Sequence, residues 1–119
     1  QLDSLVVGTG NRSELSIGYF TKYGDGGADL LPLGQLLKSE VVALAREFGV
    51  PQQVIDKPPS AGLWLGQTDE GEMGFTYAEL EAYLTLGPEA VDPAVTARIY
   101  HLARSSSHKR AVPPIYPRD

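Results

Sequence analysis

The 119-residue sequence contains no cysteine, and this absence excludes several kinds of chemistry. Without cysteine there is no disulfide framework, no zinc site built on thiolates and no cysteine nucleophile. No apolar run approaches the ~18 residues that a membrane-spanning helix needs, and no basic-then-apolar leader is visible. A net charge of −5 argues against general binding to nucleic acid. We therefore expect a cytoplasmic protein of one domain that works neither in a membrane nor on nucleic acid.

What the sequence does contain is a series of short periodic segments separated by glycine and proline. The expected elements, in chain order, are a buried strand at 5–7, a helix from residue 11, a short apolar run at 30–33, a helix at about 36–48, and helices at about 76–87 and 92–105. Capping signals mark three of the helix starts, at Asn11–Glu14, Thr76–Glu79 and Asp92–Pro93. Residues 57–74 are expected to form a loop, with Trp64 as its only large apolar anchor.

The alternation of strand and helix predicts an α/β fold, with a parallel sheet flanked by helices. A parallel sheet has both faces covered and needs more than two strands, whereas only 5–7 and 30–33 are candidates here. The chain also begins with Gln1 rather than Met. We therefore expect a piece of a longer protein that holds the rest of the sheet. The helix at 36–48 is expected to bury an apolar face that includes Leu44 and Phe48.

The junction between the first strand and the first helix is a candidate anion site. A glycine-rich strand end followed by a helix start presents backbone N–H groups and the positive end of the helix dipole. The segment matches neither the Rossmann nor the Walker fingerprint. Glu14 in this segment has two interpretations: the acid of a capping box, or a magnesium ligand at a phosphate site.

Several titratable side chains follow, each with a structural and a functional interpretation. Lys38 falls in the first turn of a helix, where a cation opposes the helix dipole unless an anion such as phosphate binds there. Lys22 and Asp29 flank a glycine-rich loop and are either solvated or ligand-binding. His108 and Lys109 follow the last helix and either stabilise a helix end or contact an anionic ligand.

Four segments together resemble the NAD synthetase family, and most closely its ammonia-dependent form. They are residues 8–14 (GTGNRSE), 19–29 (YFTKYGDGGAD), 57–63 (KPPSAGL) and 107–110 (SHKR). The resemblance covers essentially all 119 residues in order. The family's Ser-Gly-Gly-x-Asp-Ser pyrophosphate loop does not occur in this sequence. The resemblance is therefore to the C-terminal half of the single synthetase domain, with the N-terminal half absent from residues 1–119.

The resemblance implies an adenine-nucleotide α-hydrolase-like (Rossmann-like) sheet with flanking helices, incomplete in this chain, and a homodimer. It implies an enzyme of NAD⁺ biosynthesis, a ligase that forms a C–N bond. The carboxylate of deamido-NAD is adenylated by ATP with Mg²⁺, pyrophosphate leaves, and ammonia displaces AMP to give NAD⁺. Adenylation is needed because a carboxylate is a poor electrophile until its oxygen becomes a good leaving group.

The resemblance also assigns roles to individual residues. Thr9, Lys38 and Ser60 match ATP contacts, Glu14 matches a magnesium ligand, and Lys22, Asp29, His108 and Lys109 match deamido-NAD contacts. No catalytic residue is assigned. The acidic stretch 67–74 resembles a mobile loop near the site.

Two other interpretations stay open at this point. In the first, the chain is a non-catalytic fragment that binds nucleotide or pairs with a complete subunit. In the second, it is part of a glutamine-dependent NAD synthetase. The segment from Thr21 to Leu33 favours the ammonia-dependent form. In each case we expect the isolated chain to be inactive, because the pyrophosphate loop is missing.

Overall fold

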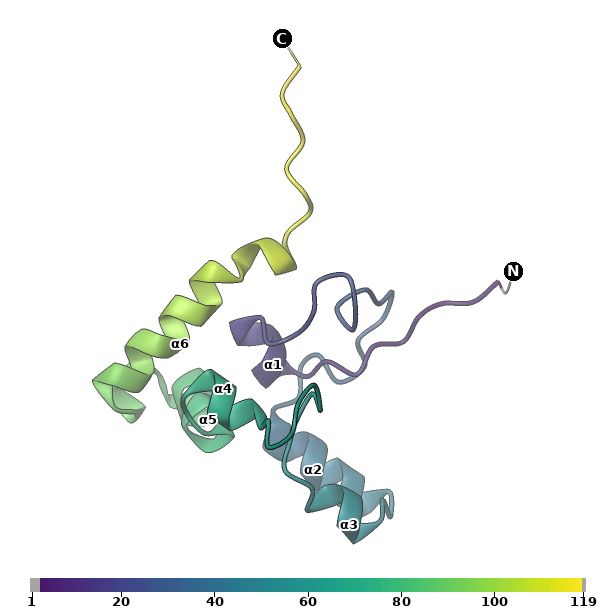
Figure 1. The fold of residues 1–119 in the computed structure, drawn as a ribbon, viewed down its shortest axis with the longest axis vertical. Helices are drawn as coiled ribbons and strands as arrows, with labels where there is room; N and C mark the ends of the chain where they lie inside the picture. Colours follow the sequence, from purple (N-terminus) through teal and green to yellow (C-terminus); the bar gives the residue numbers. More distant parts are fainter. Residues whose placement is uncertain (1–2, 119) are drawn as a thin grey trace.

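The computed structural model describes residues 3–118 as short helices joined by loops (Figure 1). The α-helices, in chain order, are α1 (Arg12–Ile17), α2 (Lys38–Glu47), α3 (Gln52–Ile55), α4 (Asp69–Met73), α5 (Tyr77–Leu86) and α6 (Pro93–Ser105). A 3₁₀ helix follows α5, η1 (Pro88–Ala90), and another follows α6, η2 (Ser107–Arg110). Within residues 3–118, no helix is both long and apolar enough to cross a membrane.

The helix starts predicted from capping signals are confirmed. At the start of α1, the side chain of Asn11 accepts a hydrogen bond from the N–H of Glu14, and the Glu14 carboxylate accepts one from the N–H of Asn11, both at 3.1 Å. Thr76 and Glu79 form the same reciprocal pair at α5, and Asp92 caps α6. These bonds satisfy N–H groups that have no partner inside the helix, so a few local residues decide where each helix begins.

The predicted sheet is not confirmed in residues 3–118. One isolated parallel bridge joins Val7 to Leu30, and the N–H of Gly8 donates to the Leu30 carbonyl oxygen at 2.8 Å. The prediction that 5–7 is buried is wrong in this structure, because its three side chains are 56–76% exposed. One neighbouring segment supplies hydrogen bonds along one edge but covers neither face of the strand. The parallel direction of the bridge agrees with the predicted α/β fold.

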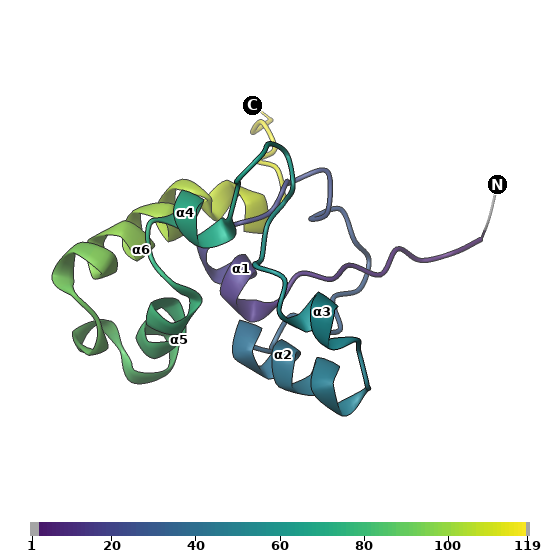
Figure 2. The same cartoon turned by 60° about the horizontal axis from the view of Figure 1, so that its bottom comes forward.

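The hydrophobic core lies where α1, α4, α5 and α6 come together (Figure 2). Its buried members are Ile17, Met73, Phe75, Tyr77, Leu80 and Ile99. Partly buried side chains of α5 and α6, among them Leu84, Val95 and Leu102, pack around them. Burying one such large apolar side chain contributes about 1.5–3 kcal/mol. The core therefore fixes α1 against α5 and α6.

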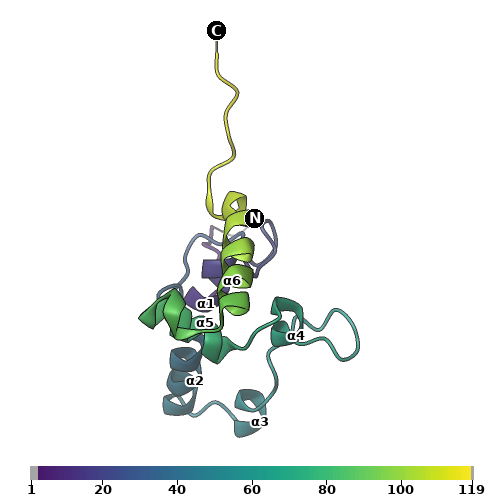
Figure 3. The same ribbon diagram turned by 90° about the vertical axis from the view of Figure 1, so that its left-hand side faces the viewer.

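The prediction that residues 57–74 form a loop throughout is wrong, because they contain helix α4. The Thr68 hydroxyl caps α4, and Gly74 ends it with a left-handed φ of 85°. Met73 anchors this region and is 1% exposed, whereas Trp64 is 55% exposed on a loop that projects from the molecule (Figure 3). Five residues are too few for helical periodicity to be visible in a sequence. Tertiary packing of Met73 stabilises a helix that would be marginal in isolation.

Helix α2 lies beside α3 and also contacts α5 (Figure 3). None of its residues is fully buried, and Leu44 and Phe48 are 37% and 77% exposed. The prediction that this face is buried is therefore wrong in this structure, because the contacts with α3 and α5 leave Leu44 and Phe48 exposed. Helix α2 makes polar contacts to α1 and α5 at its N-terminus, the end that carries Lys38.

Candidate functional site

A cavity of about 470 Å³ is lined by all four residues assigned to ATP and magnesium. Thr9 comes from the loop before α1, Glu14 from α1, Lys38 from the first turn of α2 and Ser60 from the loop after α3. The carboxylate-bearing residue Asp69, at the start of α4, also lines it. Residues that are far apart in the sequence therefore meet on one concave surface.

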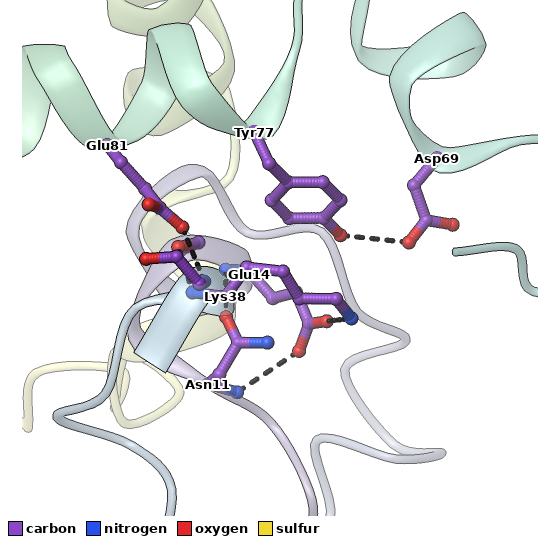
Figure 4. Close-up of polar contacts among 8 residues, drawn as sticks. Asn11, Glu14, Lys38, Asp69, Tyr77 and Glu81 are labelled. Carbon is purple, nitrogen blue, oxygen red and sulfur yellow. Dashed lines mark hydrogen bonds and ion pairs between the residues drawn. The ribbon is translucent and has the colours of Figure 1, made fainter. Parts of the chain in front are cut away.

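The Glu14 carboxylate has two partners at once (Figure 4). One oxygen accepts the capping hydrogen bond from Asn11, and the other lies 3.3 Å from the Nζ of Lys38. The side chains of Lys38 and Glu14 are 25% and 18% exposed, so their attraction is screened less than that of a surface pair. The capping hydrogen bond and the ion pair with Lys38 therefore coexist on one carboxylate.

Lys38 is the first residue of α2, where the unpaired N–H groups and the helix dipole disfavour a cation. Acceptors from other elements surround this end. The Ser13 hydroxyl accepts from the N–H of Lys38 at 3.1 Å, and the Glu81 carboxylate of α5 accepts from the next N–H at 2.8 Å. The ammonium pairs with Glu14 and lies 5.2 Å from the ring centroid of Tyr77. The charge that looked uncompensated in the sequence is therefore balanced within the chain.

A second cavity, of about 490 Å³, adjoins the first and shares Tyr19, Asp25 and Ala61 with it. Lys109 of η2 lines this second cavity. Its ammonium donates to the carbonyl oxygens of Gly18 at 2.9 Å and Phe20 at 2.7 Å. Lys109 therefore fixes the backbone on both sides of Tyr19, at the boundary between the two cavities.

The four residues assigned to deamido-NAD do not line one cavity, whereas the residues assigned to ATP and magnesium do. Lys22 lies 5.4 Å from the ring centroid of Tyr23, and the Asp29 carboxylate accepts a hydrogen bond from the N–H of Val6 at 2.8 Å. Neither residue lines the two cavities described above. His108 lines a smaller cavity of about 260 Å³ together with Lys109. Of this set, only His108 and Lys109 lie together.

Sequence reasoning missed two tyrosine–carboxylate contacts beside the cavities. The Tyr77 hydroxyl donates to Asp69 at 2.8 Å, and the Tyr19 hydroxyl donates to Glu72. Burial, and then the bond to Asp69, raise the pKa of Tyr77 far above its usual value. Burial and the Glu72 bond do the same to the pKa of Tyr19, while the bond from Tyr19, followed by one from Gln67, lowers the pKa of Glu72. No motif in the sequence pairs these side chains, because the two members of each pair come from different elements.

Magnesium would fit this site as a partner of one carboxylate. Residues 3–118 contain no group of three or more His, Cys, Asp or Glu side chains placed to hold a metal ion. Mg²⁺ in nucleotide sites needs no such group, because it takes one or two carboxylates and completes its shell with phosphate oxygens and water. Glu14 lines the cavity, and its charged partner there is Lys38, whose ammonium is carried on a flexible stem. The donor set therefore fits a metal that arrives with a phosphate ligand.

Curated relatives match nearly all of this chain. A protein of Carboxydothermus hydrogenoformans named NH(3)-dependent NAD(+) synthetase is 54% identical over 114 residues, which are 96% of this chain and 46% of that protein. One of the same name from Archaeoglobus fulgidus is 53% identical over 116 residues, 96% of this chain and 47% of that protein. The chain therefore spans about half the length of these relatives.

Solved structures also match nearly all of this chain over about half of their own length. The NMN synthetase of Francisella tularensis superposes with a TM-score of 0.90 at 46% identity, over 97% of this chain and 47% of that one. The NH3-dependent NAD synthetase of Campylobacter jejuni gives a TM-score of 0.69 at 31% identity, over 97% of this chain and 46% of that one. The family model of NAD synthase matches residues 1–113. On this evidence, the chain belongs to the NAD synthase family.

Proposed function

We propose that this chain forms the C-terminal half of an ammonia-dependent NAD⁺ synthetase, a cytoplasmic homodimer. The observation that carries the proposal is the cavity that Thr9, Glu14, Lys38 and Ser60 line together. We call the longer protein that would contain this chain the full-length enzyme. Its N-terminal half would supply the pyrophosphate loop and the remaining strands of an adenine-nucleotide α-hydrolase-like sheet.

The reaction would proceed in two steps. The carboxylate oxygen of deamido-NAD attacks the α-phosphorus of ATP, and the bond to the departing pyrophosphate breaks. Ammonia then attacks the activated carbonyl carbon, loses a proton, and AMP departs with the carboxyl oxygen. Lys38 would bind the ATP phosphates, since an ammonium neutralises charge where a triphosphate must be held. Thr9 and Ser60 would orient the nucleotide through their hydroxyls.

Glu14 is the residue of this chain that would hold Mg²⁺. The bound ion would neutralise phosphate charge and orient the triphosphate. Within the chain, Glu14 would exchange part of its contact with Lys38 for the ion, and the lysine would turn to the phosphates. The capping hydrogen bond to Asn11 uses the other oxygen and would keep α1 in place during this exchange.

The test is to assay the isolated chain and the full-length enzyme for NAD⁺ formation from deamido-NAD, ATP, Mg²⁺ and ammonium. We expect turnover in the range of about 1–10³ s⁻¹ for the full-length enzyme and none for the chain alone. No turnover in the full-length enzyme would refute the proposal. Activity with glutamine but not with ammonium would identify the glutamine-dependent form. Turnover by the isolated chain would contradict its assignment as an incomplete half.

The acid substrate can be tested in the same assay, because one of the similar solved structures is named an NMN synthetase. We expect amidation of deamido-NAD to be faster than that of the corresponding mononucleotide acid. Faster turnover of the mononucleotide would reassign the substrate while keeping the reaction type.

We expect Lys22→Met and Asp29→Asn each to raise the apparent KM of the full-length enzyme for deamido-NAD by about tenfold. This is the effect of losing one charge-assisted hydrogen bond to the substrate. Asparagine keeps an acceptor for the N–H of Val6, so the bridge between 5–7 and Leu30 survives the change. Steady-state kinetics with each substrate varied would check this. Equal increases in KM for ATP and deamido-NAD would show instead that the glycine-rich loop has collapsed.

A further inference from the structure

A line of contacts behind the first cavity connects α2 to α4 through α5 (Figure 4). The ammonium of Lys38 lies 5.2 Å from the ring centroid of Tyr77, and the hydroxyl at the far end of that ring donates to Asp69 at 2.8 Å. Tyr77 and Asp69 are 7% and 6% exposed. Lys38 and Asp69 line the cavity of about 470 Å³, whereas Tyr77 is not among its lining residues.

The two sides of the Lys38 ammonium have different partners. Glu14 attracts it by charge at 3.3 Å, and the ring of Tyr77 attracts it through the negative face of its π system. A lysine stem is flexible, so a single partner would leave the ammonium many positions. When Glu14 changes partner, as the proposed function requires, the ring is the contact that remains.

We propose that Tyr77 is a positioning residue of the ATP site, whose ring holds the Lys38 ammonium at the cavity wall while Asp69 holds the ring. The inference rests on the proposed function, because it concerns the lysine assigned to the ATP phosphates. Tyr77 acts through Lys38 and does not itself touch the nucleotide.

Tyr77 contributes a polar contact as well as apolar area to the core. A leucine would satisfy the packing against Leu80 and Met73, whereas a tyrosine must find a partner for its buried O–H. Asp69 is that partner, and a buried carboxylate is costly unless it is hydrogen-bonded. A tyrosine hydroxyl is protonated at neutral pH, and burial followed by the bond to Asp69 raises the pKa of Tyr77 further, so it remains a donor.

The experiment compares substitutions in the full-length enzyme. Tyr77→Leu removes the ring face, and we expect the apparent KM for ATP to rise about three- to thirtyfold, with the KM for deamido-NAD unchanged. Tyr83→Leu is the matched control, since Tyr83 is a partly buried tyrosine of α5 that packs on the same core. It should leave the KM for ATP unchanged.

A second variant and a spectroscopic measurement keep the test decisive if Tyr77→Leu does not fold. Tyr77→Phe keeps the ring and loses only the bond to Asp69, so the KM for ATP should rise by about two- to fivefold. In the full-length enzyme labelled on lysine, the ε-methylene protons of Lys38 should show an upfield ring-current shift in the NMR spectrum. That shift should diminish in Tyr77→Phe as the ring loses its tether.

The outcomes separate this inference from the proposed function. An active Tyr77→Leu enzyme with an unchanged KM for ATP, or a Tyr83→Leu enzyme with an equal increase, would overturn the role of Tyr77 alone. Lys38 ε-methylene protons without a ring-current shift would overturn it as well. A wild-type enzyme with no synthetase activity would overturn the proposed function, and with it the assignment to ATP.

Discussion

Replacing Glu14 by glutamine should lower NAD⁺ formation by the full-length enzyme at least about a hundredfold, while the protein stays folded. Loss of a partner outside the ligand shell already costs about 10- to 100-fold in metal affinity or activity, so loss of the carboxylate itself should exceed that. Glutamine can still accept the hydrogen bond from the N–H of Asn11, so the cap of α1 survives. Release of pyrophosphate, followed over a range of Mg²⁺ concentrations, would measure the first step.

Glu79→Gln is the matched control, because Glu79 occupies the same position in the capping box of α5 and does not line the first cavity. Both variants lose one charge and keep one cap, and Glu14→Gln also loses the ion pair with Lys38. We expect Glu79→Gln to keep nearly full activity. If Glu14→Gln instead melts early while its folded fraction keeps its specific activity, Glu14 serves the cap and not the metal.

The features predicted correctly from the sequence are those whose information is local. A capping box lies within four residues, so Asn11 and Glu14 fix the start of α1 whatever surrounds them. The burial of 5–7 depends instead on neighbouring strands that a short pattern cannot supply, and those residues are exposed in this structure. Helix α4 was missed for a related reason: Met73 becomes an anchor only because α1, α5 and α6 provide its surroundings.

The candidate site, like the fold, could be predicted only in part. Spacing alone could not place Thr9, Glu14, Lys38 and Ser60 together, because their meeting depends on how α1, α2 and the loop after α3 pack. The family resemblance assigned the four residues to one site, and in the structure they line one cavity. Neither source indicated the contact between Lys38 and Tyr77, since a residue that acts from behind a cavity wall has no motif of its own.

Replacing Lys38 by glutamine should weaken ATP binding to the full-length enzyme by about 10- to 100-fold, because it removes a charge-assisted contact worth roughly 1.5–3 kcal/mol. The structure also changes the expected effect on stability without ligand. From the sequence, Lys38 opposes the helix dipole, so its loss would leave stability equal or slightly higher. In the structure it pairs with Glu14 and lies on Tyr77, so its loss should cost about 0.5–2 kcal/mol.

Thermal unfolding with and without ATP and Mg²⁺ would measure both effects on one protein. The Lys38→Gln enzyme should melt slightly earlier than wild type without ligand and should lose most of the stabilisation that ATP gives. Lys57→Gln is the matched control, since Lys57 lines the same cavity and its replacement removes the same charge. It should keep most of the shift caused by ATP. A Lys38→Gln enzyme that melts early but keeps the full ATP shift would show that this lysine serves only the contact between α1 and α2, and that the phosphates are held by other residues.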